Sequence, residues 1–430
     1  MAIRLNASDA DFEARFAALV AGKREAANDV DKTVRAIMAD VREKGDAALL
    51  AYTRRFDRHD LKAEGLRVQA DEVDAAMARA AAPVVEALKL ARDRIESYHS
   101  RQRPQDAMHV DELGVELGAR WLPLEAVGIY VPGGTASYPS SVLMNAVPAK
   151  VAGVERIVMV VPSPQGRLNP LVLAAARIAG IDEIYRVGGA QAIAALAYGT
   201  ETIAPVVKIV GPGNAFVASA KRQVFGHVGI DMIAGPSEIL VVADSDNNPD
   251  WVAADLLAQS EHDTSAQAIL ITDDEKLAWS VEAAVERQIA TLPRSETARA
   301  SWRDFGAIIQ VASVADSPPL VDRVAPEHLE LAVADPESLL ARIRNAGAIF
   351  LGRYTPVAIG DYVAGCNHVL PTGRSARFSS GLSVLDFMKR SSLLRLDAES
   401  LATLAPATFA LAQAEGFDAH ARSVSIRLNR

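Results

Sequence analysis

The sequence predicts an α/β protein built on mostly parallel β-sheet. Short, continuously apolar runs such as 156–160 (RIVMV) and 238–243 (EILVVA) have the composition of strands covered on both faces. Segments of about ten to fifteen residues with apolar side chains at helical spacing follow these runs. Because strand and helix patterns alternate, consecutive strands are expected to pair in parallel through helical crossovers.

The elements follow in a clear order. Residues 1–100 are mostly helical in pattern, with a break at Gly45 and an interruption at Pro83. A series of βα units then begins near 126, and a second series begins at 238. The last fifty or so residues are helical with no following strand, which indicates an appendage.

Composition excludes several classes of protein. Half of the 430 residues are hydrophobic and 23% are charged, which is ordinary for a globular chain. The net charge of −9 argues against a nucleic-acid-binding surface. Cys366 is the only cysteine, so disulfides and cysteine-based zinc sites are excluded. The charged N-terminus and the absence of a long apolar run predict a soluble cytoplasmic protein.

Glycine-bearing turns between strand and helix patterns are candidate ligand loops. They are Gly133–Gly134, Gly166, Gly188–Gly189 and Gly211–Gly213. In open α/β sheets such turns line the carboxyl edge, where ligands bind. None has the GxGxxG spacing, and glycine in these turns is more often ordinary turn chemistry. Spacing alone therefore does not identify a nucleotide cofactor.

Residues 255–263 (DLLAQSEHD) place an amide, two carboxylates and an imidazole at the predicted end of a helix. Gln259 and His262 are three apart, so on a helix they share a face and could reach one ion. Glu261 and Asp263 would point elsewhere. A solvated helix end is the alternative, since this pair lacks the specificity of HExxH.

A second cluster is APEHLE at 325–330. Pro326 suits the first position of a helix, which predicts Glu327 and His328 in its first turn. Adjacent helical residues point about 100° apart, so these two should have different roles. The positive end of the helix would keep His328 neutral, as a general base must be. An ordinary polar first turn is the alternative.

Further polar candidates follow. Residues 359–384 are predicted to form a long polar loop that carries Asp361, Asn367 and His368, with turn formation as the alternative role. Glu415 and His420 lie near the C-terminus. Taken together, the carboxylates, histidines and amide of the second half predict a metal-dependent α/β enzyme with an adjacent acid/base pair.

At this point the sequence closely resembles the histidinol dehydrogenase family over almost its whole length. The landmarks are VPGGTASYPSSVLMNAVPAKVAG, GGAQAIAALAYGTE, IVGPGNAFVASAKRQVFG, IDMIAGPSEILVVAD, DLLAQSEHD, APEHLEL and GDYVAGCNHVLPT, in that order. The resemblance implies a four-electron, NAD-dependent oxidation of L-histidinol to L-histidine through histidinaldehyde, with one zinc per subunit. These are the last two steps of histidine biosynthesis.

The resemblance also implies roles for individual residues. The acid/base pair falls on Glu327 and His328. The implied zinc ligands are Gln259, His262, Asp361 and His420. The implied substrate contacts are these four ligands together with Ser237, His328 and Glu415. The implied NAD contacts are Tyr130, Gln191 and Asn214.

The family's fold implies two incomplete Rossmann-like parallel-sheet domains with extensions at both ends. The predicted division is a helical N-terminal extension (1–25), a first domain (26–128 and 237–381) with the zinc and catalytic residues, an NAD-binding second domain (129–236), and a C-terminal extension (382–430). That extension would reach the partner subunit of an intertwined homodimer and complete its active site with Glu415 and His420.

Two other functions stay open on the sequence. A zinc hydrolase could use Glu327 to activate water, and it would need no nicotinamide cofactor. A non-catalytic protein could use the metal only to hold a dimer together. The metal itself is also open, because manganese or cobalt could take the same oxygen and nitrogen ligands.

Overall fold

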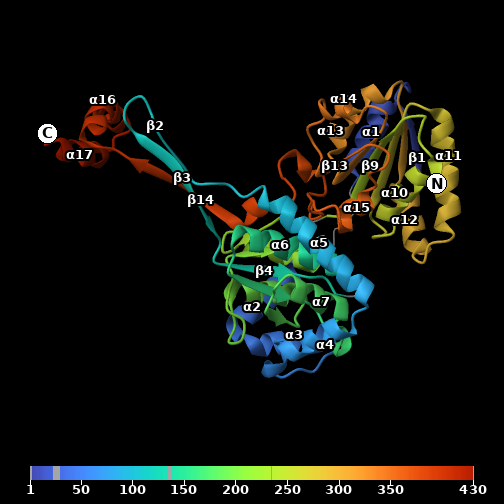
Figure 1. Cartoon of the computed structure of the whole chain (residues 1–430), viewed down its shortest axis with the longest axis horizontal. Coiled ribbons are helices and arrows are strands. Elements are labelled where there is room, and N and C mark those ends of the chain that lie inside the picture. The colour runs from blue at the N-terminus through green and yellow to red at the C-terminus, as the bar shows by residue number, and fades with distance from the viewer. Residues whose placement is uncertain (1, 23–29, 134–137, 234, 430) are drawn as a thin grey trace.

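The computed structural model describes residues 2–22, 30–133, 138–233 and 235–429. It contains two lobes, each built around a parallel sheet, and an arm that projects away from both (Figure 1). We call the lobes the six-stranded lobe and the five-stranded lobe. The arm consists of three antiparallel strands and two helices. The predicted α/β class with parallel sheets is therefore confirmed.

The six-stranded lobe has the strand order β1-β11-β10-β9-β12-β13, and every neighbouring pair is parallel. Its strands are β1 (Ile3–Asn6), β9 (Glu238–Ala243), β10 (Gln267–Thr272), β11 (Ala307–Gln310), β12 (His328–Ala332) and β13 (Ala348–Leu351). One face is covered by α10 (Pro249–Ser260), α11 (Glu275–Ile289) and α12 (Ser295–Phe305). The other face is covered by α1 (Phe12–Ala21), α13 (Pro318–Val324) and α14 (Pro336–Leu340). Burial on both faces explains why the central strands β9, β10 and β11 are almost entirely apolar.

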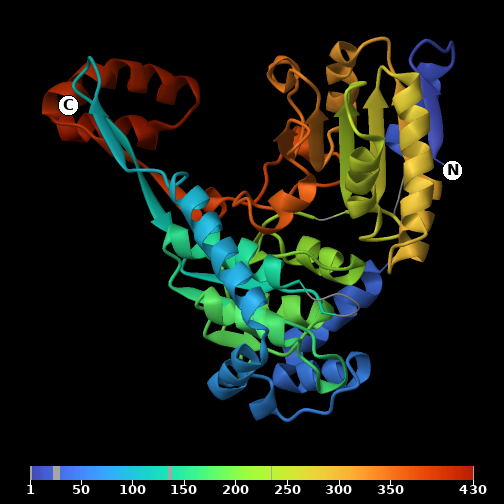
Figure 2. The same cartoon turned by 45° about the vertical axis from the view of Figure 1, so that its right-hand side comes forward.

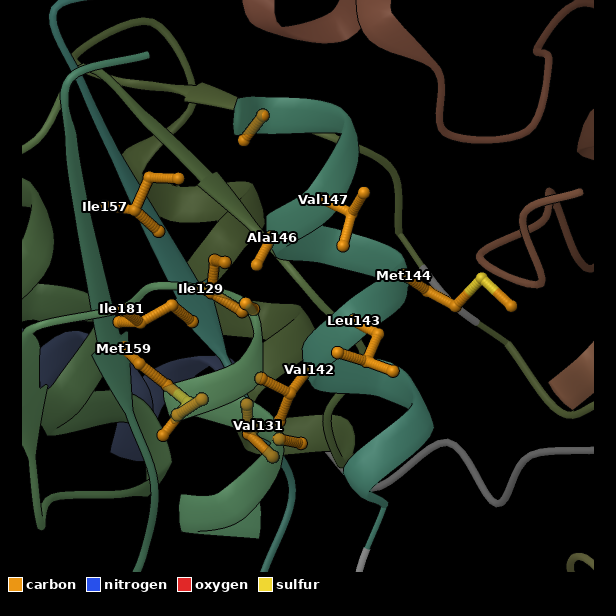
Figure 3. Close-up of a cluster of buried hydrophobic side chains, with 14 of the residues drawn as sticks. Ile129, Val131, Val142, Leu143, Met144, Ala146, Val147, Ile157, Met159 and Ile181 are labelled. Carbon is orange, nitrogen blue, oxygen red and sulfur yellow. The ribbon is translucent and has the colours of Figure 1, made fainter. Parts of the chain in front are cut away.

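The five-stranded lobe has the strand order β6-β5-β4-β7-β8, again all parallel. Its strands are β4 (Ala126–Tyr130), β5 (Arg156–Val160), β6 (Glu183–Tyr185), β7 (Lys208–Val210) and β8 (Gly229–Ile230). Its crossover helices are α6 (Pro139–Ala152), α7 (Pro170–Ile178), α8 (Gly189–Tyr198) and α9 (Ala215–Val224). Figure 3 shows Val142 and Ala146 of α6 on the side of the helix that faces Ile129 and Met159 of the sheet.

The helices of residues 31–100 pack on this same lobe. They are α2 (Asp31–Lys44), α3 (Asp46–Phe56), α4 (Ala70–Arg79) and α5 (Ala82–Ser100). α2 and α3 join the core that contains α8 and α9, whereas α4 and α5 join the core that contains α6 and α7. The predicted first domain placed 26–128 together with 237–381, that is, with the six-stranded lobe. The helices of 31–100 instead pack on the five-stranded lobe. The domain boundaries themselves stay a prediction.

The N-terminal segment is not purely helical. β1 pairs with β11 in register from Ile3 opposite Ala307, so it forms an edge of the six-stranded sheet. Four residues are too few for a pattern to distinguish a strand from irregular chain. Residues 23–25 of the predicted extension and 26–29 of the predicted first domain lie outside the described residues.

The arm is formed by segments that are far apart in sequence. β14 (Met388–Arg395) pairs antiparallel with β3 (Glu116–Pro123), which pairs antiparallel with β2 (Ala107–Val110). α16 (Ala398–Ala414) and α17 (Asp418–Ser425) lie at its far end (Figures 1 and 2). The sequence predicted the helices of this C-terminal appendage but not β14, which is needed to build the arm.

Candidate active site

A cavity of about 500 Å³ is lined by residues of both lobes. From the five-stranded lobe come Pro132 after β4 and Pro212–Asn214 after β7, at the carboxyl ends of the strands. From the six-stranded lobe come Ser237 before β9 and Glu327 before β12, at the amino ends. The rule that ligands bind at carboxyl ends therefore describes only one wall of this cavity.

Glu327 and His328 lie at the start of a strand, not in the first turn of a helix. α13 ends at Val324, and Ala325 takes a left-handed conformation (φ 48°) that breaks the helix before Pro326. β12 then begins at His328. The helix expected here is wrong, because proline permits an extended continuation as readily as a helix start.

Because His328 begins a strand, the positive end of a helix cannot be what sets its charge. Burial by itself lowers the pKa of His328, but the Glu327 and Asp361 carboxylates outweigh it and leave this pKa above its ordinary value. Glu327 Oε2 lies 3.7 Å from His328 Nδ1, and Asp361 Oδ1 lies 3.6 Å from His328 Nε2. No helix N-terminus is present to keep the imidazole neutral.

The backbone of Glu238 holds both members of the pair. Its N–H donates to Glu327 Oε2 at 2.9 Å, and its carbonyl oxygen lies 3.0 Å from His328 Nδ1. A carbonyl can only accept, so Nδ1 carries the proton and Nε2 is left as the basic nitrogen. The Glu238 side chain in turn accepts from the Glu327 N–H at 3.3 Å and the Gly373 N–H at 3.1 Å. Glu238 was not singled out from the sequence, because a glutamate at a strand start carries no signal of its own.

Three of the predicted zinc ligands line this cavity: Gln259, His262 and Asp361. Gln259 is 2% exposed and lies in the last turn of α10, and its Nε2 has no hydrogen-bond partner. α10 ends at Ser260, so His262 lies in the following turn rather than on the helix. Its N–H donates to Gln259 O at 3.1 Å, and this turn replaces the helical spacing expected for the pair.

Asp361 lies in the last turn of α15 (Val357–Tyr362), where the sequence predicted a loop. Burial raises its pKa, but neighbouring imidazoles, His328 foremost, outweigh it and hold the pKa of Asp361 below its ordinary value. Burial also lowers the pKa of His262. Across residues 2–22, 30–133, 138–233 and 235–429, no three His, Cys, Asp or Glu side chains are arranged to hold a metal ion.

The other loop candidates separate into two roles. His368 lines the cavity, and its Nδ1 lies 2.8 Å from Asp361 O. Asn367 is buried, accepts from the Val369 N–H and donates to Met144 O, so it shapes the turn and packs beneath it. The turn role considered for this segment is correct for Asn367.

Glu415 and His420 are not brought to the cavity of their own chain. Glu415 follows α16, His420 lies in α17, and both are exposed. Both helices lie at the end of the arm, away from the two lobes (Figure 2). A single chain therefore supplies Gln259, His262 and Asp361 of the predicted ligands, and not His420.

The predicted NAD contacts fall at three strand–helix turns. Asn214 lines the cavity and caps α9 by accepting from the N–H groups of Phe216 and Val217. Tyr130 is buried, its hydroxyl accepts from the Gly189 N–H at 3.1 Å, and burial raises its pKa to about 12. Gln191 is 2% exposed, and its Oε1 has no hydrogen-bond partner. Tyr130 and Gln191 thus lie beneath the surface that Asn214 helps to form.

A buried ion pair that no sequence pattern indicated fixes one of these turns. The side chains of Lys221 and Asp231 are 3% and 1% exposed and contact each other directly. Lys221 Nζ donates to Gly211 O at 3.0 Å, and Asp231 Oδ2 accepts from the Gly211 N–H at 2.8 Å. Gly211 has φ 111°, and a Cβ there would lie 2.2 Å from Tyr130 O. The N–H and the carbonyl oxygen of Gly211 are therefore both held by hydrogen bonds, just before Pro212–Asn214 at the cavity wall.

Comparison with known proteins decides the family. A family model described as histidinol dehydrogenase matches residues 21–428. The chain belongs to the histidinol dehydrogenase family. Histidinol dehydrogenases of Brucella suis biovar 1 and Mesorhizobium japonicum are each 69% identical over 429 residues, which cover 100% of both chains. The crystal structure of histidinol dehydrogenase from Elizabethkingia anophelis is also similar, with a TM-score of 0.96, 36% identity and coverage of 100% of this chain and 98% of that one. The family catalyses the final steps of histidine biosynthesis.

The described residues contain no helix long and apolar enough to cross a membrane.

Proposed function

We propose that the chain oxidises L-histidinol to L-histidine through L-histidinaldehyde, using NAD⁺ as the electron acceptor in both steps. The observation that carries this proposal is the pair of Glu327 and His328, held by the backbone of one residue at the wall of a cavity that both lobes line. A cytoplasmic location belongs to the same proposal and rests on the biosynthetic role of the family.

His328 acts as the general base. Its Nδ1–H is held by Glu238 O, so the basic Nε2 faces the cavity side where Asp361 lies 3.6 Å away. Nε2 takes the hydroxyl proton of histidinol as the adjacent carbon loses hydride, and it acts again in the second oxidation. General bases held in this way contribute about 10²–10⁴-fold to rate.

Glu327 activates the water that attacks the aldehyde carbon. The Glu238 N–H orients Glu327 Oε2, and this carboxylate also lies 3.7 Å from His328 Nδ1, where it stabilises the protonated imidazole. Hydration converts the aldehyde into a diol. Once His328 has released its first proton to solvent, it can deprotonate this diol in the second hydride step. Two neighbouring residues thereby take two different roles.

The donor set fits zinc. Gln259, His262 and Asp361 offer an amide, an imidazole and a carboxylate at one wall, and the amide of Gln259 is buried with one end unpartnered. Because amide oxygen and nitrogen are assigned from hydrogen bonds, that unpartnered end is free to present oxygen. Bound zinc would orient the imidazole and amine of the substrate. The proposed nicotinamide cofactor site is supported by Gln191, whose buried Oε1 has no hydrogen-bond partner.

The fourth zinc ligand is proposed to be His420 of the partner subunit, with the partner's Glu415 as a substrate contact. The arm carries many large apolar side chains that are exposed in the single chain, and a partner subunit could cover them. These residues are Met108, Val110, Leu113, Leu393, Leu394, Leu411, Phe417 and Ile426. We therefore propose an intertwined homodimer in which each arm completes the other subunit's site.

A complementation experiment tests both the metal site and the dimer. His262→Ala and His420→Ala proteins should each be inactive and bind zinc weakly. After co-refolding, half of the dimers should be mixed, and each mixed dimer holds one intact site, so roughly a quarter of the wild-type NADH formation should return. If mixed dimers are demonstrated by mass but show no activity, His420 acts within its own chain. If His420→Ala alone is active, His420 has no role in the site.

A further inference from the structure

Two carboxyl groups that the proposed reaction does not use lie between α10 and β12. Glu330 is 2% exposed, in the middle of β12, and Asp255 of α10 is partly buried. Each carboxyl group shifts the pKa of the other, so the two side chains face each other across the layer between the helix and the sheet. Two carboxyl groups can hydrogen-bond to each other only if one of them carries a proton.

Strand register places Glu330 directly behind the active site. Glu330 lies opposite Val241 of β9, and His328 lies opposite Ile239. Ile239 and Val241 belong to the core beneath α10, so His328 and Glu330 project on that same face of the sheet. Leu329 belongs to the core on the opposite face, as the alternation of a strand requires.

Helical spacing places Asp255 in the corresponding position on α10. Asp255 precedes Gln259 by four residues, so the two side chains share a face, about one turn apart. Asp255 is therefore one helical turn before Gln259, a proposed zinc ligand, and Glu330 is two residues after His328, the proposed general base. The carboxyl pair links the helix and the strand that carry these two groups.

The residues around this carboxyl pair are apolar, so burying the two carboxyl groups costs desolvation free energy that packing alone does not require. Around it, α10 and the sheet meet through Val241, Leu256 and Ala332, all buried. Burial, together with the charge of Asp255, raises the pKa of Glu330 to about 9, and burial raises the pKa of Asp255 to about 6. Apolar side chains of similar volume would fill the same layer without desolvating a carboxyl group.

We propose that Asp255 and Glu330 share one proton and that the hydrogen bond between them fixes the last turn of α10 against the first residues of β12. Both are positioning residues: they set where Gln259 and His328 stand relative to each other. This inference rests on the proposed function, which assigns those two residues their roles. Residues that orient metal ligands from behind commonly change metal affinity or activity 10–100-fold when they are replaced.

Three variants separate positioning from packing. Glu330→Gln keeps a donor for the Asp255 carboxylate. The double variant Asp255→Leu/Glu330→Met removes both polar groups and keeps the volume, so it should fold. Asp250→Asn is the control, because Asp250 is exposed in the first turn of the same helix and contacts Arg287.

The measurements are the zinc dissociation constant by chelator competition, kcat for histidinol oxidation, and amide hydrogen exchange over residues 256–262 without zinc. Glu330→Gln and Asp250→Asn should stay within about threefold of wild type in all three. The double variant should keep a wild-type melting temperature or a higher one. It should nevertheless bind zinc about 10–100-fold more weakly, lose kcat, and exchange faster over 256–262.

Wild-type zinc affinity and exchange in the double variant would overturn the proposal, and so would equal losses in Glu330→Gln and the double variant. The two levels of inference remain distinguishable. If the wild-type protein does not oxidise histidinol, the proposed function fails. The exchange comparison needs neither zinc nor substrate, so it still decides whether the pair positions α10.

Discussion

Replacing Glu327 with glutamine should separate the two oxidations. In the Glu327→Gln variant, the amide oxygen can still accept the Glu238 N–H, which donates to the carboxylate at 2.9 Å in the wild-type protein. The side chain therefore stays in place while its charge and basicity are lost. Without a base for water, aldehyde oxidation should fall by about 10²–10⁴-fold, equivalent to about 3–5 kcal/mol in the activation barrier.

Alcohol oxidation should change much less, because His328 remains. The lost charge lies 3.7 Å from His328 Nδ1. A unit charge at about 4 Å contributes about 1 kcal/mol in water and about 4 kcal/mol at an effective dielectric constant of 20. Its removal lowers the pKa of His328, so the pH profile of alcohol oxidation should move to lower pH. The maximal rate of that step should fall by no more than about tenfold.

The assay follows NADH formation separately from L-histidinol and from L-histidinaldehyde, with a carbonyl-trapping reagent to detect released aldehyde. The variant should form about one NADH per histidinol and accumulate trapped aldehyde. Equal losses with the two substrates would refute the division of roles between Glu327 and His328.

Three further predictions concern other parts of the site. His328→Asn should reduce both oxidations by about 10²–10⁴-fold, and a variant that loses only one of them would contradict a shared base. Lys221→Met leaves Asp231 buried without its partner, so it should lower the free energy of unfolding by about 3–5 kcal/mol and raise the KM for NAD⁺. Lys44→Met is the control because Lys44 is exposed, and it should change the free energy of unfolding by less than about 1 kcal/mol. An equal loss in the two lysine variants would contradict a stabilising role for the buried Lys221–Asp231 ion pair. The pKa of Glu330 is raised from 4.5 to about 9, so its contribution to stability is complete below pH 4.5 and is lost as the pH rises through 9. In urea unfolding, the free energy of unfolding of Glu330→Gln should rise relative to that of the wild type by up to about 1.4 kcal/mol for each pH unit between 4.5 and 9. A difference between the two proteins that does not change with pH would exclude the raised pKa of Glu330.

The class of the fold was predictable because its signal is local. Apolar strand runs that alternate with helical spacing can be read directly from the chain, and both sheets are parallel as expected. Strand order is not local, and nothing near Ile3 indicates that β1 pairs with a strand that begins at Ala307. β14 was missed for a similar reason, because its partner β3 lies more than two hundred residues earlier in the chain.

The candidate site was predictable mainly through resemblance to a family. Local patterns placed His328 in a helix, because Pro326 is compatible with both a helix start and an extended chain. Gln259 was recognised as a donor, but its burial with an unpartnered amide is a tertiary property. Asp255 and Glu330 could not have been found, because carboxylates on a helix and a strand usually face solvent. Only the packing of α10 on the six-stranded sheet brings them together.

The most direct test of the proposed reaction is its stoichiometry. Protein stripped of metal by a chelator should form no NADH from L-histidinol. After zinc is restored, it should form two NADH for each L-histidine produced. No NADH from histidinol after restoration would contradict the proposed reaction, and zinc-dependent hydrolysis without a nicotinamide cofactor would then be the function to test.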